Sequence, residues 1–279
     1  MLGRLMKYEI RATERIFLPL YGLILAFALV NRLLRAFNPE ANDWGNLPVN
    51  LSAFLNGVTM TVYVLLVVAL FVVTFVVTIQ RFQKNLLGDE GYLMFTLPVK
   101  AHAHIDCRMI VTLMWTVLSL IVSALSIFIL SVDESNMRTF SEWCLSMRRE
   151  FAEHGASSWL ILFECVVLLA VSILAGTLQL YAAIAVGNRS ARHRQLAACG
   201  AYIGFGIVEQ IITFGGFNAL NGISPDSWLR AWLGGVARSL PNAALLEIAL
   251  GLFILYCALF GLAFYALTNY LLSRKLNLE

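Results

Sequence analysis

Charged residues are scarce in this chain, and their scarcity decides its broad class. Asp, Glu, Lys and Arg supply 13% of the 279 residues, against 59% hydrophobic residues, whereas a soluble domain typically carries about 25% charged residues. A helix of about 20 apolar residues spans the hydrocarbon core of a bilayer. The sequence therefore predicts an all-α integral membrane protein with six transmembrane helices. The six apolar runs are 16–30 (extendable to 34), 54–79, 109–130, 158–186, 195–215 and 241–272.

Motifs for catalysis and for nucleotide binding are also missing. The phosphate-binding pattern GxxxxGKS/T is absent, as are HExxH and GxSxG. The five cysteines form no CxxC pair, which argues against a zinc site or a disulfide framework. His102 and His104 stand two apart in an expected loop, with only Asp106 as an acidic neighbour, which is a weak set of metal ligands. We expect no catalytic activity, no metal and no cofactor bound by this chain; if ATP drives it, a partner subunit binds the ATP and Mg.

Lysine and arginine are distributed unevenly between the two sides that six spans create. With a cytoplasmic N-terminus, the inside holds 13 of the 20 basic residues and the outside holds 7. Cytoplasmic loops carry an excess of Lys and Arg, so both termini are predicted to be cytoplasmic. The formal net charge of +3 then reflects topology and does not indicate nucleic-acid binding.

The first fifteen residues are predicted to form a helix in the membrane interface. Apolar residues recur at helical spacing, and charged residues take the opposite face. The apolar set is Leu2, Leu5, Met6, Ile10 and Phe17, and the charged set is Arg4, Lys7, Arg11, Glu14 and Arg15. Such a helix places its apolar stripe in the acyl boundary and its basic face among the headgroups. This elbow helix either couples the first span to a cytoplasmic partner or only anchors the chain, and the sequence leaves both readings open.

The segment 80–108, between the second and third runs, is the most informative part of the chain. Gly88 and Gly91 frame an acidic pair able to cap a helix N-terminus, and Pro98 ends any helix at or before Leu97. Charge complementarity to a docking partner would explain acidic residues on an otherwise basic inner surface. The alternative is that the apolar side chains of this segment pack beneath the spans. The candidate docking residues are Asp89, Glu90, Gly91, Tyr92, Phe95 and Pro98.

Three stretches carry a family resemblance: residues 1–26, 81–99 and 188–212, of which GDEGYLMFTLPV (88–99) is the most specific. They resemble the membrane permease subunits of bacterial ATP-binding cassette (ABC) exporters of the type-2 kind, in a branch common in Gram-positive anaerobes. The resemblance covers most of the chain and fades in 133–157. It implies an elbow helix, a cytoplasmic coupling helix between spans two and three, and a re-entrant outer hairpin between spans five and six. It also implies a bacterial plasma-membrane location, a second permease as dimer partner, and two separately encoded ATPase subunits.

The outer segments and two of the spans hold further candidate sites. Segment 133–157 is expected to be an outside loop, and 214–240, which contains five glycines and two tryptophans, to be a re-entrant hairpin or an ordinary amphipathic loop. In the resembled family, spans two and five line the path at the dimer interface. The candidate residues for the path or dimer seam are Asn56, Thr59 and Tyr63, which share one helix face, together with the small-xxx-small pair Gly200 and Gly204.

Three carboxylates inside the spans are candidates for an outer vestibule. Glu164, Glu209 and Glu247 each lie about six residues from the outer end of a run, which is about 9 Å at a rise of 1.5 Å per residue. Carboxylates at similar depth indicate a polar vestibule for a cationic or amphipathic substrate. The alternative is that each one snorkels, pairs locally or is protonated.

The whole chain, 1–279, is therefore predicted to be a single permease domain of an ATP-driven exporter that moves an amphipathic compound outward. The alternative is a stand-alone secondary transporter or channel. That class is expected to show inverted repeats and broken helices with charges near mid-membrane, and the sequence offers neither pattern.

Overall fold

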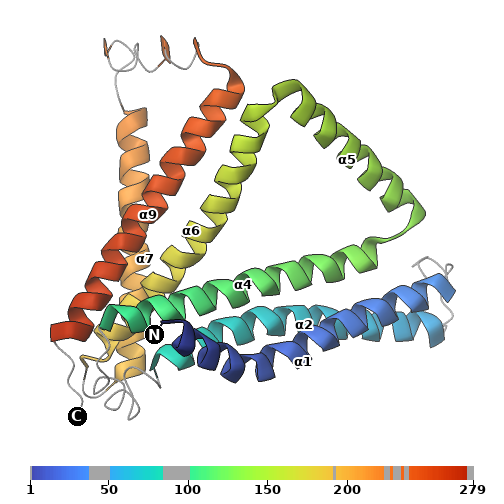
Figure 1. Cartoon of the computed structure of the whole chain (residues 1–279), viewed down its shortest axis with the longest axis horizontal. Coiled ribbons are helices and arrows are strands. Elements are labelled where there is room, and N and C mark those ends of the chain that lie inside the picture. The colour runs from blue at the N-terminus through green and yellow to red at the C-terminus, as the bar shows by residue number, and fades with distance from the viewer. Residues whose placement is uncertain are drawn as a thin grey trace. The chain divides into compact units, whose positions relative to one another are not determined.

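The fold is all-α throughout the residues that the computed structural model describes, which are 2–37, 51–83, 101–190, 193–222, 227–228, 234–235 and 239–274. Seven long helices run through these residues, and no strand occurs among them (Figure 1). In chain order they are α1 (Leu2–Phe37), α2 (Leu51–Phe82), α4 (Ala101–Ser131), α5 (Glu134–His154), α6 (Ala156–Gly187), α7 (Arg194–Asn221) and α9 (Asn242–Arg274).

Six of these helices are long and apolar enough to cross a membrane, which confirms the six predicted spans. The chain is therefore a multi-pass membrane protein. Several helices run beyond the predicted apolar runs; α4, for example, begins at Ala101, so His102 and His104 lie in a helix and not in the expected loop. The candidate spans are Met6–Leu34, Phe54–Phe82, Ile105–Ser131, Ala156–Gly187, Arg194–Gly216 and Ala243–Leu272.

The helices group into two compact units. The first unit consists of Met1–Arg81 and Asp106–Ser146, and the second consists of Phe82–Ile105 and Met147–Glu279. The first unit therefore contains α1, nearly all of α2 and most of α4, whereas the second contains α6, α7 and α9. The boundaries at Phe82 and Ile105 mean that the ends of α2 and α4 nearest the 83–100 segment belong to the second unit.

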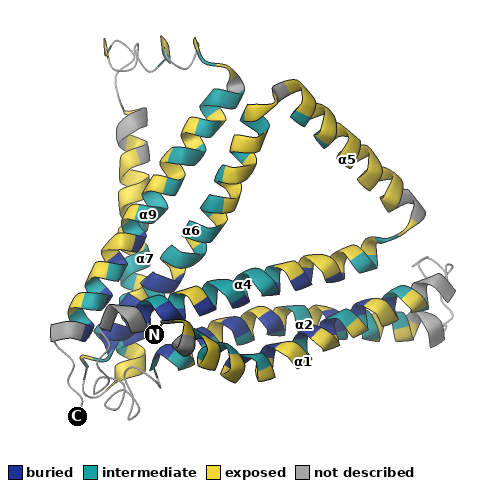
Figure 2. Cartoon of the chain, in the orientation of Figure 1, coloured by how far each residue is buried: buried dark blue, intermediate teal, exposed yellow. Residues whose placement is uncertain are grey.

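An aromatic core holds the first unit together. Phe17 of α1 stacks on Trp115 of α4 with ring centroids 4.6 Å apart, and Tyr21 tilts against both rings. Met6 and Ile10 pack against the same core. Three members of the predicted apolar stripe, Met6, Ile10 and Phe17, thus pack in the core of this unit. Buried and intermediate residues alternate with exposed ones along α1 (Figure 2). The buried members of the core are Phe17, Tyr21, Ile24, Ala28, Tyr63, Leu70, Val111, Trp115 and Val122.

Hydrogen bonds between side chains also join the helices of the first unit. The Tyr21 hydroxyl lies 2.9 Å from the Ser119 hydroxyl of α4. Thr59 of α2 donates to the Asn31 side-chain oxygen of α1 at 2.9 Å. Polar pairs of this kind between spans contribute about 1 kcal/mol each, so apolar packing supplies most of the stability and these bonds fix the rotation of each helix.

The second unit is built from α6 with α9 parallel to it and α7 antiparallel. Ser157 pairs with Glu247 near the starts of α6 and α9, and a Cβ at Gly261 of α9 would meet the Ala175 methyl of α6 at 3.5 Å. Farther along, the rings of Phe205 in α7 and Phe264 in α9 lie 5.4 Å apart. Burial in α6 is concentrated at its C-terminal end, where eight residues between Thr177 and Gly187 are buried.

Three predicted segments fare differently in the structure. Of the predicted elbow helix, residues 2–15 continue into the first span as one helix, α1, so its placement in the interface stays a prediction. Of the predicted hairpin 214–240, the first eight residues extend α7 to Asn221, and most of the rest lies outside the described residues. Segment 133–157, expected to be a loop, is largely the helix α5.

Candidate functional site

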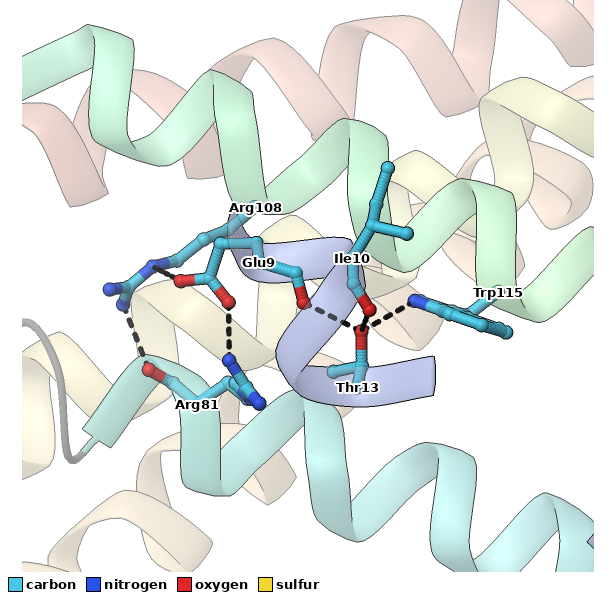
Figure 3. Close-up of polar contacts among 6 residues, drawn as sticks. All are labelled: Glu9, Ile10, Thr13, Arg81, Arg108 and Trp115. Atoms are coloured by element: carbon cyan, nitrogen blue, oxygen red, sulfur yellow. Dashed lines mark hydrogen bonds and ion pairs between the residues drawn. The ribbon is translucent and has the colours of Figure 1, made fainter. Parts of the chain in front are cut away.

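Three charged side chains from three helices meet at one end of the first unit (Figure 3). Arg81, the penultimate residue of α2, donates from Nη1 to Glu9 Oε2 of α1 at 2.6 Å. Arg108 of α4 places Nε 3.9 Å from Glu9 Oε1 and donates from Nη1 to the Arg81 backbone oxygen at 2.9 Å. One carboxylate thus faces two guanidinium groups, and we call these three residues the Glu9 cluster.

The Glu9 cluster is largely shielded from solvent. The side chains of Glu9 and Arg108 are 13% and 5% exposed, whereas that of Arg81 is 25% exposed. Charged groups removed from water must be paired and hydrogen-bonded, because an unpaired buried charge is strongly destabilising. The cluster satisfies this requirement through its ion pairs and through the bond to the Arg81 carbonyl.

A hydrogen-bond chain links this end of α1 to the aromatic core. Thr13 lies one turn beyond Glu9. Its hydroxyl donates a shared hydrogen bond to the backbone oxygens of Glu9 and Ile10, at 2.7 and 3.0 Å. The Trp115 indole Nε1 donates to the Thr13 hydroxyl oxygen at 2.8 Å (Figure 3). The Glu9 backbone is therefore connected through the Thr13 hydroxyl to the Trp115 ring, which stacks on Phe17.

The Glu9 cluster brackets the predicted coupling segment. Arg81 closes α2 on one side of that segment, and Arg108 lies in the second turn of α4 on the other. Glu9 therefore joins the N-terminal helix to both helices from which the segment emerges. The predicted docking residues Asp89, Glu90, Gly91, Tyr92, Phe95 and Pro98 lie outside the described residues.

The residues that follow Arg81 in the chain, Phe82 and Gln83, belong to the second unit. Phe82 is fully buried and stacks on Tyr181 of α6, with ring centroids 4.1 Å apart and planes at 9°. Gln83, the residue after Phe82, lines a small pocket of about 180 Å³. Its lining residues are Gln83, Ile184, Asn188, Arg194 and Gln195. Two adjacent residues at the end of α2 thus have partners in different units. Arg81 bonds to Glu9 of the first unit, and Phe82 stacks on Tyr181 of the second.

The predicted seam residues fall into two groups. Tyr63 is buried in the first unit, where its hydroxyl lies 2.8 Å from the Ser126 hydroxyl, and Thr59 bonds to Asn31. The Asn56 side-chain oxygen is buried and lacks a hydrogen-bond partner among the described residues. By contrast, Gly200 and Gly204 of α7 have open space where a Cβ would stand. The structure does not bring the α2 residues and the α7 glycines together within either unit.

The three predicted vestibule carboxylates lie at three levels of the second unit. Glu247 accepts a hydrogen bond from Ser157, in the first turn of α6. Glu164 is seven residues farther along α6, about 10 Å at 1.5 Å per residue, and its Oε2 is buried with no partner among the described residues.

Glu209 lies deeper, because α7 runs antiparallel to α9. Thr213 bonds to Tyr256 at 2.5 Å, and Phe205 contacts Phe264. Glu209 is midway between Thr213 and Phe205 in sequence, so it lies between levels about 14 and 26 Å beyond Glu247 along α9. The three carboxylates therefore lie at three successive levels along the helix axes and do not share the similar depth expected from the sequence. The levels depend on how α6 and α7 are aligned with α9.

The Glu9 cluster was not among the residues that the sequence pattern selected. One signal was available: Glu9 stands four residues after Leu5 and three after Met6, so a lone carboxylate interrupts the apolar stripe of the first helix. An acidic residue on a stripe that becomes buried requires a cationic partner. Which of the arginines would supply it depends on helix rotation, which the sequence does not state. Among the described residues, no group of three or more His, Cys, Asp and Glu could hold a metal ion.

Comparison with known proteins adds no relative to these observations. No protein family, no curated protein and no solved structure matches the chain.

Proposed function

We propose that this chain is the membrane-spanning permease subunit of an ATP-driven ABC exporter in the bacterial plasma membrane, working as a dimer with separate ATPase subunits. The observation that carries the proposal is the Glu9 cluster, which joins the N-terminal helix to both helices flanking the segment predicted to dock the ATPase. A transporter driven from outside its membrane domain needs such a rigid link between the docking segment and its spans. A loop anchored at one end only would move without moving the helices.

In this proposal, the ATPase subunits contact Asp89, Glu90 and Phe95, and two sets of contacts transmit the resulting displacement to the spans. ATP binding closes the ATPase subunits and displaces the docking segment. Arg81 and Arg108 pass the displacement to α1 through Glu9, and Phe82 passes it to α6 through the stack on Tyr181. Both units then respond to one event.

The translocation path is proposed to form between two copies of the permease, along spans two and five. Open space at Gly200 and Gly204 supports close approach of another helix to α7. The unpartnered Asn56 oxygen in α2 supports a hydrogen bond supplied by a neighbouring chain, because an unsatisfied buried polar group costs about 1–3 kcal/mol.

A photocrosslinking amino acid at Phe95 tests the docking assignment. We expect irradiation in the native host to join this chain to a protein that carries the phosphate-binding motif which the chain itself lacks. The matched control is Glu142, an exposed residue of α5 on the opposite side of the predicted topology. Mass spectrometry of the adducts decides the question. A nucleotide-binding partner captured at Phe95 alone supports docking, and none at Phe95, or equal capture at both sites, overturns it.

A second candidate function is a stand-alone secondary transporter, which Glu209 favours. Its level, between Tyr256 and Phe264, is well inside the span Ala243–Leu272. Carboxylates this deep in a membrane mark ion or proton pathways. Transport by the purified chain in vesicles without ATP, abolished by Glu209→Gln, would establish this candidate in place of the exporter.

A further inference from the structure

Helix α5 is the one long helix among the described residues that is too polar to cross the membrane, and the proposed export mechanism gives it no role. It has 21 residues. Five of its apolar residues recur at intervals of three and four, which places these five on one face, with Trp143 at its edge and Leu145 outside it. We call them the α5 stripe: Met137, Phe140, Cys144, Met147 and Phe151. The opposite face carries Arg138, Glu142, Arg149 and Glu153.

Most of α5 is uncovered. Every residue from 136 to 146 is exposed, including Phe140 at 42% and Trp143 at 55% (Figure 2). The ring contacts of the helix lie with its neighbours at each end. Phe140 meets Phe128 of α4 edge-on at 5.5 Å, and Phe151 meets Trp159 of α6 at 5.0 Å. Between these contacts Trp143 and Cys144 stay exposed, with Trp143 stacked on Phe140 of the same helix. Exposure of apolar side chains to water is unfavourable.

Short connections hold both ends of α5 at the membrane boundary. The third span ends at Ser131 and the fourth begins at Ala156, so two residues precede α5 and one follows it. The single following residue, Gly155, has φ 50° and ψ −110°, a backbone conformation that residues other than glycine rarely adopt. A helix of 21 residues is about 31 Å long. Tied to spans at both termini, it cannot leave the bilayer surface.

We infer that α5 lies flat in the lipid headgroup region of the leaflet opposite the Glu9 cluster, with its stripe in the acyl boundary. Three spans separate α5 from the start of α1, which fixes the opposite side. The stripe lies between the candidate spans of α4 and α6 in the chain, and it carries Phe140 and Phe151 with Trp143 at its edge. Phenylalanine and tryptophan are residues that the apolar face of an interfacial helix favours.

The charges of α5 indicate the kind of surface it meets. The helix has four acidic residues, Glu134, Glu142, Glu150 and Glu153, against three basic residues, Arg138, Arg148 and Arg149. A balance of four to three gives no net attraction to anionic lipid. Zwitterionic phospholipid is therefore sufficient, and burial of the stripe supplies the binding energy.

The native Cys144 lies on the stripe and is exposed, so it can carry a spin label. The experiment uses full-length protein in phosphatidylcholine vesicles with the other four cysteines replaced. The matched control moves the label to the polar face, in Cys144→Ser/Ser146→Cys, two residues away. Collisions with oxygen, which concentrates in lipid, and with a water-soluble nickel chelate are then measured at both positions.

We expect the ratio of oxygen to nickel accessibility to be several-fold higher at position 144 than at 146, with the label about 5–10 Å below the headgroups. High nickel accessibility at both positions would mean that α5 stands in water. Low accessibility to both reagents at 144 would mean that protein covers the stripe. Either result overturns the inference.

A second measurement does not depend on cysteine replacement. With the native cysteines kept, a photocrosslinking amino acid replaces Met147 on the stripe or Arg149 on the polar face. We expect the Met147 variant to gain the mass of one phospholipid, and the Arg149 variant to gain none. A crosslinked dimer of this chain from position 147 would replace the lipid by a second copy and reject the proposal.

Discussion

Replacing Glu9 with alanine is expected to destabilise the protein by about 3 kcal/mol, because it removes the carboxylate that pairs with two guanidinium groups. Removing one partner of a buried ion pair typically costs about 3–5 kcal/mol. Arg108 is 5% exposed and cannot regain water, whereas Arg81, at 25%, can do so in part. We therefore expect the low end of that range. Thermal unfolding of the detergent-solubilised protein measures the effect.

Glu14→Ala is the matched control for Glu9→Ala. Glu14 lies on the same helix, is half-buried, and takes part in no ion pair recorded among the described residues. Its replacement should change stability by about 0.5 kcal/mol or less, as is usual for positions without a specific contact. Glu9→Gln should lie between the two, since the amide oxygen still accepts a hydrogen bond while the charge is lost. Equal losses from Glu9→Ala and Glu14→Ala would contradict the assigned ion pairs.

Gly187→Ala is expected to force α6 and α7 apart. A Cβ at Gly187 would stand 2.5 Å from the Ala198 backbone nitrogen and 2.6 Å from its Cα. Backbone atoms cannot rotate away as a flexible side chain can. The added methyl must shift a helix, and overpacking of this kind typically costs about 1–3 kcal/mol. The free energy of unfolding, or the melting temperature in detergent, should fall accordingly.

The same substitution at Gly176 should raise the stability that Gly187→Ala lowers. Gly176 lies on the same helix, and a Cβ there would meet nothing within 4 Å. Alanine in a helix interior is more favourable than glycine by about 0.5–1 kcal/mol. Gly176→Ala should therefore raise the melting temperature slightly while Gly187→Ala lowers it. If both variants stabilise the protein, the close contact between Gly187 and Ala198 is not present in solution.

Much of the fold was predictable because bilayer thickness acts on composition directly. A run such as 54–79 must form a span, whatever packs beside it, and the span Phe54–Phe82 confirms it. Segment 133–157 was expected to be an outside loop, yet its sequence carries the pattern of the helix α5. The three- and four-residue spacing from Met137 to Phe151 was the better guide.

The site was less accessible to sequence reasoning because it depends on contacts between helices. Arg81 and Arg108 belong to the 13 basic residues that the topology places inside, and nothing in their spacing pairs them with Glu9. The levels of Glu164 and Glu209 likewise follow from the register of α6 and α7 against α9, not from their distance to the end of a run. The docking residues around Asp89 stay a prediction, since they lie outside the described residues.

The most direct test of the proposed function is affinity purification of the tagged chain from its native host in mild detergent, followed by mass spectrometry of the proteins that accompany it. The exporter account predicts a stoichiometric ATP-binding cassette subunit. It also predicts that combined alanine substitution of Asp89, Glu90 and Phe95 removes that subunit while leaving the permease folded. A clean homo-oligomer with no ATPase would contradict the account, and the stand-alone transporter would then take its place.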